Sequence, residues 1–395
     1  MRLEESLDWL YASQQFGIKL GLENTFRLLE AAGHPERELK IIHVAGTNGK
    51  GSTCAMAEAI LRAAGLRVGL YTSPHLVDFR ERIRVDGNMI PKEDTATGLT
   101  KLHGSCTEWE HSPTFFELST VLALTHFAAS ACDYVVLETG MGGRLDATNA
   151  VMPVVSAITP LAMDHSEWLG DQLALIAEEK AGIIKAGVPV VSAPQKPDAA
   201  AVLRDKAAKA GSPITFVDKP WLGAVALPGA HQCWNAALAV EAVRKCGANV
   251  SEETITQALA KVAWPARFQR IGDRIVLDGG HNPHAAAALV ATWLEVFGTE
   301  KATIVFGALA DKDYAAMVAA FQPIAREFLF VPVSSPRGAD PASFPPLCPA
   351  PNRCCDNLPA ALALAMAGPH RILIAGSLFL AGEALSLLVK NPSVS

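Results

Sequence analysis

The chain has 395 residues, of which 50% are hydrophobic and 19% charged, and its formal net charge is −6. This ordinary globular composition excludes collagen, coiled coil and low-complexity disorder, and at about 150 residues per domain the length predicts two to three domains. The acidic balance excludes a global basic field, so we expect no nucleic acid and no membrane surface among the partners. Any anion site must therefore be local.

The cysteines and the apolar stretches indicate a cytoplasmic protein. The eight cysteines are scattered, with no CxxC pair and no zinc-ligand spacing, and are expected to be reduced thiols. The first residues, MRLEESLDWLYASQQ, carry acidic side chains where a secretory signal needs a basic and then an apolar region. Residues 372–389 are apolar but are broken by two glycines, a serine and a glutamate, which favours a strand and a helix over a membrane span.

Short apolar runs alternate with helical patterns from about residue 39, as in βαβ units with a mostly parallel sheet. Strands are predicted at residues 40–45, 68–72, 134–138, 154–159 and 189–192. Helices are predicted at residues 54–64, 113–131 and 252–262. Because proline ends a helix and makes the preceding residue extended, Trp264-Pro265 marks a boundary after the last of these helices.

The alternation restarts beyond this boundary. Strands are predicted at residues 274–278, 303–307, 327–332 and 371–375, and the Pro-rich segment 332–351 is predicted to be a surface loop. The sequence therefore predicts an α/β fold with a first domain at 1–263, a linker at 264–267 and a second α/β domain at 268–395.

Residues 46–53 read GTNGKGST between a predicted strand and a predicted helix, which is typical of a phosphate-binding loop. Glycines let backbone N–H groups turn inward, the helix N-terminus adds partial positive charge, and Lys50 adds a cation, so the loop would hold a nucleotide triphosphate. Gly51 separates Lys50 from Ser52, so the match to the strict P-loop pattern is a variant. The alternative is a glycine turn that merely joins the strand to the helix.

Polar residues follow two further predicted strands. Glu138 ends one strand, and Asp164-His165 follow another through a short loop. In an open parallel sheet, ligands collect beyond the carboxyl ends of the strands, so Glu138 is a candidate Mg²⁺ ligand. The alternatives are a Glu138 that pairs with a surface cation and a purely structural histidine.

Lys180 lies on the apolar stripe of its predicted helix, in phase with Leu173, Ile176, Ala177 and Ile184. We expect it to be partly buried. It either reaches solvent or pairs with Glu138 or Glu178, or it has a depressed pKa that lets the neutral amine react with CO₂ to form a carbamate. A carbamate would be an anionic oxygen ligand for Mg²⁺.

Nine motifs give the chain a family resemblance. In order they are HVAGTNGKGST, TSPHL with ERIRVDG, TFFE, ETGMGGRLDATN, MDHSEWLG, EKAGIIK, WPARFQ, DGGHNPHA and AGSLFLAGEAL. The chain resembles the bifunctional dihydrofolate synthase/folylpolyglutamate synthase family of Mur-ligase-like ATP-dependent amide ligases, over roughly residues 1–385. The resemblance implies a P-loop domain of the Mur-ligase central type with a mostly parallel sheet, and a smaller Rossmann-like glutamate-ligase domain.

The resemblance also implies cofactors and a nucleotide site. ATP, two Mg²⁺ ions and a carbamylated Lys180 are expected, with K⁺ as a candidate further cation. The implied metal ligands are Ser52, Glu138, His165 and Lys180. The implied ATP-binding residues are Gly46, Thr47, Asn48, Gly49, Lys50, Gly51, Ser52, Thr53, Asn235, Arg267 and Asp278. Lys50, Lys180 and His281 are the implied catalytic residues.

The implied substrates are dihydropteroate, reduced folates and L-glutamate, and the implied substrate-binding residues are Arg82, Thr114, Phe116, Asp146, Ala147 and Ser377. A monomer is expected. Structural roles remain alternatives: TFFE as a helix start with core aromatics, residues 278–283 as a strand-to-helix turn, Ser377 as a helix cap, and Arg267 as a linker anchor. The segment at residues 222–227, just before Gly229, is shorter than the resemblance implies for many family members. We expect this difference to affect an exposed hairpin or oligomer contacts rather than the chemistry.

The implied reaction phosphorylates the acceptor carboxylate with the γ-phosphate of ATP, and the amine of glutamate then displaces phosphate from the acyl phosphate. Positioning and charge stabilisation supply the catalysis, and no protein nucleophile is needed. The rival interpretations are a folate-only polyglutamylase, another Mur-type amino-acid ligase, a P-loop switch NTPase and a non-catalytic nucleotide-binding module.

Overall fold

The structure, a computed structural model, describes residues 1–16, 21–163 and 172–390. The chain divides into two compact units. The first comprises Met1–Pro74, Arg80–Val225 and Cys233–Val262. The second comprises His75–Phe79, Ala226–Gln232 and the chain from Ala263 onward.

The first unit is built on an eight-stranded sheet with the order β4-β3-β2-β5-β1-β6-β7-β8. Six neighbouring strands of the sheet, β2, β5, β1, β6, β7 and β8, run parallel. Strands β3 and β4 add an antiparallel edge beside β2. The strands are β1 (Ile41–Ala45), β2 (Val68–Tyr71), β3 (Ile83–Val85), β4 (Asn88–Met89), β5 (Tyr134–Glu138), β6 (Val155–Ile158), β7 (Val190–Ser192) and β8 (Ile214–Phe216). The central β1, β5 and β6 are wholly buried, as expected of strands covered on both faces.

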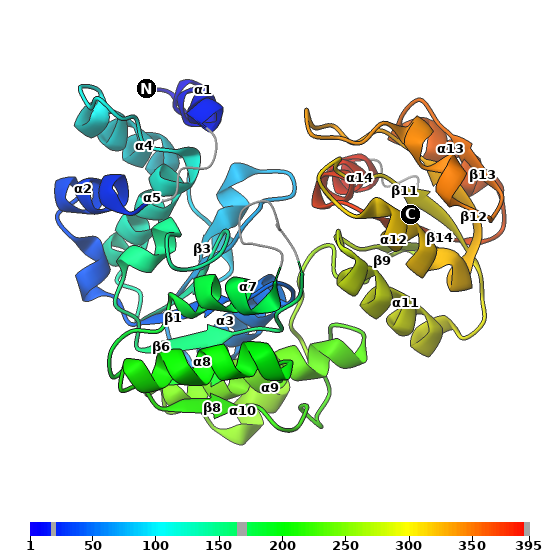
Figure 1. Cartoon of the computed structure of the whole chain (residues 1–395). Coiled ribbons are helices and arrows are strands. Elements are labelled where there is room, and N and C mark those ends of the chain that lie inside the picture. Colours follow the sequence, from blue (N-terminus) through cyan, green and yellow to red (C-terminus); the bar gives the residue numbers. More distant parts are fainter. Residues whose placement is uncertain (17–20, 164–171, 391–395) are drawn as a thin grey trace. The chain divides into compact units, whose positions relative to one another are not determined.

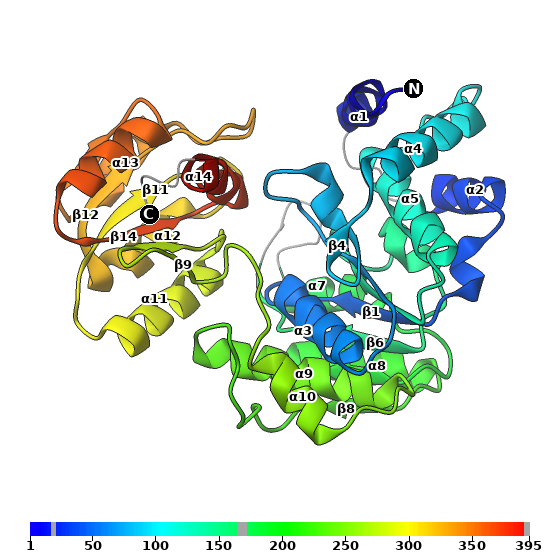
Figure 2. The same cartoon turned by 180° about the vertical axis from the view of Figure 1, so that it is seen from behind.

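Helices cover both faces of this sheet (Figures 1 and 2): α8 lies in front of it in Figure 1, and α3 lies in front in Figure 2. Ala177 and Ala181 of α7 and Leu203 of α8 pack on Ala45 and Ile158. The helices that lie wholly in this unit are α1 (Leu3–Ala12), α2 (Glu23–Ala31), α3 (Lys50–Ala63), α4 (Lys92–Cys106), α5 (Phe115–Ala129), α7 (Leu173–Ala181), α8 (Pro197–Lys209) and α10 (Glu252–Leu259). Helix α9 (Ala230–Lys245) begins in the second unit and continues in the first, and short 3₁₀ turns include η3 (Phe79–Arg82) and η4 (Ala147–Ala150).

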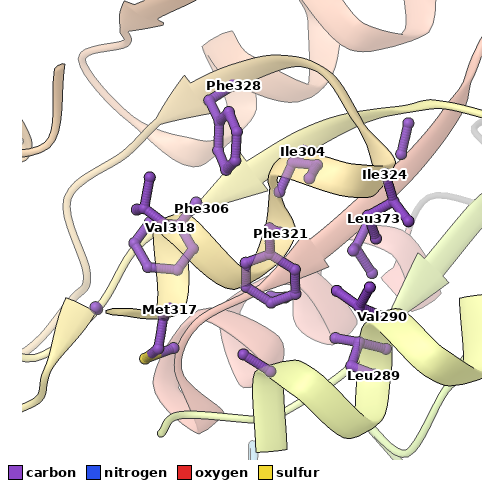
Figure 3. Close-up of a cluster of buried hydrophobic side chains, with 14 of the residues drawn as sticks. Leu289, Val290, Ile304, Phe306, Met317, Val318, Phe321, Ile324, Phe328 and Leu373 are labelled. Atoms are coloured by element: carbon purple, nitrogen blue, oxygen red, sulfur yellow. The ribbon is translucent and has the colours of Figure 1, made fainter. Parts of the chain in front are cut away.

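The second unit holds a six-stranded sheet with the order β13-β12-β11-β14-β10-β9, parallel except for β9. Its strands are β9 (Gln269–Ile271), β10 (Ile275–Leu277), β11 (Ala302–Phe306), β12 (Ala325–Phe330), β13 (Asn352–Cys354) and β14 (Arg371–Ala375). Its further helices are α11 (Pro283–Phe297), α12 (Tyr314–Phe321), α13 (Leu358–Ala367) and α14 (Leu378–Lys390). Figure 3 shows the core on one face of this sheet, where Phe306 and Phe328 from the strands meet Phe321 of α12.

The two-sheet α/β architecture confirms the predicted fold class, and every predicted strand is present within one or two residues at each end. Two expectations are wrong. Helix α3 begins at Lys50, four residues before the expected start, because Gly49 in a left-handed conformation forms its N-cap. Segment 332–351 is more than a surface loop, since it forms the 3₁₀ turns η6 (Pro341–Ser343) and η7 (Pro345–Leu347) and buries Phe344 completely in the core.

All eight cysteines are free thiols, as expected. Within residues 1–16, 21–163 and 172–390, no helix is both long enough and apolar enough to cross a membrane.

Candidate active site

The glycine loop at residues 46–49 passes from the buried end of β1 into the first turn of α3. Gly46 and Gly49 have φ values of 150° and 89°, which side-chain-bearing residues rarely adopt. A Cβ at Gly46 would overlap the side chain of Thr159, and one at Gly49 would lie 2.5 Å from Oδ1 of Asn235. The structure therefore brings Asn235 against the loop, as the implied nucleotide site requires.

Two lysines converge on one carbonyl group of this loop. Lys50 Nζ donates to the carbonyl oxygens of Gly46 (3.1 Å) and Thr47 (3.3 Å). Lys180 Nζ, from α7, donates to the same Gly46 oxygen at 2.9 Å. Lys180 is only 4% exposed, which confirms the expectation of burial. The glycine loop thus has two lysine side chains hydrogen-bonded to its backbone.

Glu138 is the last residue of β5, is 3% exposed, and lies opposite Val44 of β1 in the sheet register. Its Oε2 accepts a hydrogen bond of 2.9 Å from the backbone N–H of Ser73. Burial is the main cause that raises the pKa of the Cys54 thiol in α3; Glu138 raises this pKa further and Lys50 lowers it. The charges of Glu138 and Lys50 therefore act on the same region of the first turn of α3, where Ser52 is 1% exposed.

His165, the remaining implied metal ligand, lies outside the described residues. Among the residues that are described, no group of three or more His, Cys, Asp or Glu side chains gathers as a metal site.

The residues implied to line an acceptor-substrate pocket lie around the start of α5. Thr114 is the N-cap of this helix: its backbone N–H donates to Glu117 Oε2 (2.7 Å), and its Oγ1 accepts from the backbone N–H of Glu117 (3.3 Å). The Phe116 ring lies 5.9 Å from that of Tyr71 and packs against Gly140, where a Cβ would lie 2.5 Å from Phe116 Cζ. The TFFE motif thus forms a helix start, as its structural interpretation predicts. The motif also borders the loop that follows Glu138.

Arg82 is buried at the end of η3, with its guanidinium 5.0 Å from the Phe115 ring centre. Burial lowers its pKa, and the nearby Tyr71 hydroxyl and Glu138 act in the opposite direction. A buried cation beside aromatic rings suits an anionic or π-rich ligand.

Asp146 is 7% exposed, and its carboxylate holds the loop that follows Glu138. Oδ2 accepts from the backbone N–H groups of Gly140 and Met141, both at 2.9 Å. Oδ1 accepts from the backbone N–H of Thr148 (3.0 Å) and from its hydroxyl (2.5 Å). Burial raises the pKa of Asp146 and these hydrogen bonds lower it. Ala147, beside it, is also buried.

In the second unit, Asp278 ties two segments of backbone together. Its Oδ2 accepts from the backbone N–H of Phe268 (2.8 Å), and its Oδ1 accepts from that of Gly280 (2.7 Å). Arg267 lies between Ala266 and Phe268, whose φ values of 54° and 45° are strained for residues with side chains. Backbone strain of this kind persists only where surrounding contacts hold the conformation. The hydrogen bond from Phe268 N–H to Asp278 is one of these contacts.

The remaining two residues implied in this unit lie near helix starts. His281 Nδ1 is 3.0 Å from the carbonyl oxygen of Gly279, and Asn282 caps α11 by accepting from the Ala285 N–H at 2.9 Å. Ser377 is 1% exposed and its hydroxyl accepts from the backbone N–H of Phe379 at the start of α14 (3.1 Å). The structural alternatives for both segments, a strand-to-helix turn and a helix cap, therefore describe their local geometry.

Sequence reasoning missed three residues that the structure places beside the site: Ser73, Tyr71 and His43. Ser73 and Tyr71 stand in or just before the TSPHL motif, which was a signal for them. His43 stands in the HVAGTNGKGST motif, but a single histidine in an apolar strand carries no local sign of its partners.

The contact between Gly49 and Asn235 predicts the effect of a small substitution. Gly49→Ala should weaken ATP binding by more than about tenfold, because the loop must shift to clear Asn235. Gly65→Ala is the matched control: Gly65 has a similar φ of 81°, but a Cβ there meets nothing within 4 Å. The control should lose about 1 kcal/mol of stability and keep its ATP affinity, measured by calorimetric titration. Equal ATP affinities in the two variants would contradict this account of the loop.

Comparisons with known proteins show which family the chain resembles. Residues 44–219 match the Mur ligase middle domain, and residues 266–378 match the Mur ligase glutamate ligase domain. The dihydrofolate synthase/folylpolyglutamate synthase of Bacillus subtilis is 34% identical over 371 residues, which span 85% of this chain and 86% of that protein. The Escherichia coli protein of the same description is 37% identical over 339 residues, spanning 82% and 80%.

Solved structures are similar over nearly the whole chain. The Mycobacterium tuberculosis folylpolyglutamate synthase complexed with ADP and AMPPCP has a TM-score of 0.91 and 29% identity, covering 98% of this chain and 99% of that one. The Escherichia coli FolC protein in complex with DHPP and ADP has a TM-score of 0.87 and 31% identity, covering 98% of both chains.

A strand, a glycine loop and a helix that begins at Lys50, in a chain with both Mur ligase domains, define an ATP-dependent ligase of the Mur ligase class. Within that class the relatives are specific. The chain belongs to the dihydrofolate synthase/folylpolyglutamate synthase family.

Proposed function

We propose that this protein uses ATP to add L-glutamate to dihydropteroate and to reduced folates, through an acyl-phosphate intermediate. In this proposal residues 1–263 form the ATP-binding domain, 264–267 the linker and 268–395 the glutamate-ligase domain. The protein acts as a cytoplasmic monomer. The observation that carries the proposal is the glycine loop between β1 and α3, which has Lys50 in the first helical turn and the buried Lys180 against its Gly46 carbonyl oxygen, because such a loop can hold the phosphates of a nucleotide.

The donor set suits Mg²⁺. Glu138 is a buried carboxylate at the carboxyl end of a parallel strand, and Ser52 is a buried hydroxyl in the first turn of α3, so both offer the oxygen atoms that Mg²⁺ prefers. We propose that these two, with His165 and a carbamylated Lys180, hold two Mg²⁺ ions, and that K⁺ is a further cation. Bound there, the ions would neutralise the charge that develops on the transferred phosphoryl group.

The chain's own residues position the reactants. Lys50 and the glycine loop at residues 46–53 hold the phosphates, and Asn235, which lies against Gly49, contributes to the nucleotide site. Arg82, Thr114, Phe116, Asp146 and Ala147 hold the acceptor. The acceptor carboxylate attacks the γ-phosphorus in line, and the uncharged amine of glutamate then attacks the acyl carbon as phosphate leaves.

In the second unit, Arg267, Asp278 and His281 are proposed to contribute to nucleotide binding, and Ser377 to lie near the incoming glutamate. Asp278 accepts hydrogen bonds from the backbone N–H groups of Phe268 and Gly280. Phe268 follows Arg267 in the sequence, and Gly280 precedes His281. The carboxylate therefore also fixes the backbone from which both side chains extend.

A substrate-dependence assay tests the proposal. ADP formation should require both L-glutamate and an acceptor, and should occur with dihydropteroate and with tetrahydrofolate when these are assayed side by side. Hydrolysis at the same rate without either substrate would instead indicate a switch NTPase. Activity with tetrahydrofolate alone would indicate a folate-only polyglutamylase, and activity with neither acceptor would overturn the proposal.

A further inference from the structure

A buried histidine on β1 is connected to the acceptor-pocket aspartate by a chain of side chains. His43 is fully buried, and its Nε2 lies 2.9 Å from Oγ1 of Thr148 in η4. The same Thr148 hydroxyl lies 2.5 Å from Oδ1 of Asp146. None of the roles assigned above uses His43 or Thr148.

The available protons determine which group donates and which accepts in the hydrogen bonds between His43, Thr148 and Asp146. Burial raises the pKa of Asp146, but three backbone N–H groups donate to its two oxygens, and in this geometry the carboxylate acts only as an acceptor. Thr148 has a single hydroxyl proton, and this proton goes to Asp146 Oδ1. His43 Nε2 must therefore be the donor to Thr148 Oγ1, which leaves Nδ1 of His43 without a proton.

A second observation agrees with this tautomer. Nδ1 of His43 is buried and has no hydrogen-bond partner. A buried N–H group without an acceptor is rarer and costlier than an acceptor without a donor, so the proton belongs on Nε2. Burial, with the nearby charge of Lys185, lowers the pKa of His43 to about 3, so the ring stays neutral and keeps one proton for the chain.

The series of hydrogen bonds from His43 through Thr148 ends at Asp146, where the acceptor would bind. Asp146 Oδ2 holds the N–H groups of Gly140 and Met141, and Gly140 packs under the ring of Phe116. A rotated Asp146 would release this loop and alter the floor beneath Phe116. Four hydrogen bonds hold the two oxygens of the carboxylate, so its orientation depends on every donor.

We infer that His43 is a positioning residue for the acceptor substrate: through Thr148 it holds Asp146, and with it the Gly140–Met141 loop, in the orientation that binds the pterin-bearing acceptor. The inference deepens the proposed function and rests on it for the identity of that acceptor. His43 itself touches no substrate. Its contribution is to fix a tautomer and thereby the direction of the Thr148 hydroxyl.

Kinetics with matched variants test the inference. Thr148→Val removes the hydroxyl at nearly constant shape, and His43→Leu removes the donor; each should raise KM for dihydropteroate by about tenfold, the cost of losing a hydrogen bond to a charged group. KM for ATP should change by less than about twofold, because the glycine loop takes no part in the hydrogen bonds that join His43, Thr148 and Asp146. Thr148→Ser and His43→Gln keep a hydroxyl and a donor at the Nε2 position, and should restore most of the affinity.

Combining the two disruptive substitutions separates a relay from independent packing. In a relay, His43→Leu adds little once Thr148→Val has broken the chain, so the double variant should resemble the single one. A purely structural role would lower the melting temperature and the active fraction of each variant without a selective change in KM for dihydropteroate. Additive losses, or an unchanged KM in both single variants, would overturn the inference.

Nitrogen NMR of the histidine ring measures the tautomer of His43 directly and needs no substrate. The wild-type protein should show His43 protonated at Nε2 and unprotonated at Nδ1, with no titration between pH 8 and about 5. A ring protonated at Nδ1 would overturn the inference even if the enzyme is active. If the wild-type protein fails to use dihydropteroate, the proposed function fails instead, and the NMR result still decides whether the chain of hydrogen bonds exists.

Discussion

Lys180→Ala should reduce glutamate-dependent ADP formation by about 1,000-fold or more, because it removes the carbamate that is a metal ligand of the proposed site. Short carboxylates such as acetate or formate, added in millimolar amounts, should restore part of the activity by occupying the space of the missing carbamate. Steady-state rates with and without the added carboxylate measure the effect.

The control is Lys180→Met, which keeps the stem of the side chain. It should be equally inactive but resist rescue, since the methionine fills the space that acetate needs. Full activity in unrescued Lys180→Ala would remove the carbamate from the mechanism. Rescue by methylammonium but not by acetate would assign the role to the amine that donates to the Gly46 carbonyl oxygen.

Glu138→Gln should lower the rate by about 1,000-fold and raise the Mg²⁺ concentration needed for half-maximal activity, because the amide has nearly the same shape but no charge for the metal. The backbone N–H of Ser73 can still donate to the Gln oxygen, so the fold around β5 should be kept. Rates measured across a Mg²⁺ titration, together with Mn²⁺ binding followed by electron paramagnetic resonance, give the two readouts.

Glu58→Gln provides the matched control for Glu138→Gln. Glu58 is also a buried carboxylate, but it lies on α3 in an ion pair of 2.7 Å with Arg62, away from the proposed metal ligands. This substitution should cost some stability while leaving the Mg²⁺ dependence unchanged. Similar Mg²⁺ profiles for the two variants would show that Glu138 is not a metal ligand.

Local sequence patterns predicted most of the sheet, and the exceptions share a cause. The strands that were not predicted are β3, β4, β8, β9 and β13, which have two or three residues each and are at most partly buried. The equally short β7 and β10 were predicted because they are wholly buried and mostly apolar. Gly49 explains the early start of α3, because its left-handed cap lies within a glycine-rich stretch that has no apolar pattern. Phe344 is buried within a proline-rich segment because tertiary packing overrides the usual exposure of such sequences.

The residues of the candidate site were predicted by type and position, but their partners were not. The burial of Lys180 follows from its place on the apolar stripe of a helix, and this was predicted. That its amine donates to the Gly46 carbonyl oxygen was not, since the sequence offered Glu138 and Glu178 as partners. The same holds for Asp146: its motif pointed to the acceptor, but nothing local indicated Thr148 and His43 behind it.

The sequence by itself determined the fold class and the ATP-dependent ligase chemistry of this protein. It could do so because a strand, a glycine loop and a helix start are specified by neighbouring residues, whose backbone preferences act over a few positions. Only the tertiary structure decided which distant groups meet: Lys180 and Gly46 are 134 residues apart, His43 and Thr148 105, and Ser73 and Glu138 65. Such pairs form because parallel strands bring their carboxyl ends to one edge of a sheet, a result of topology that no local pattern contains.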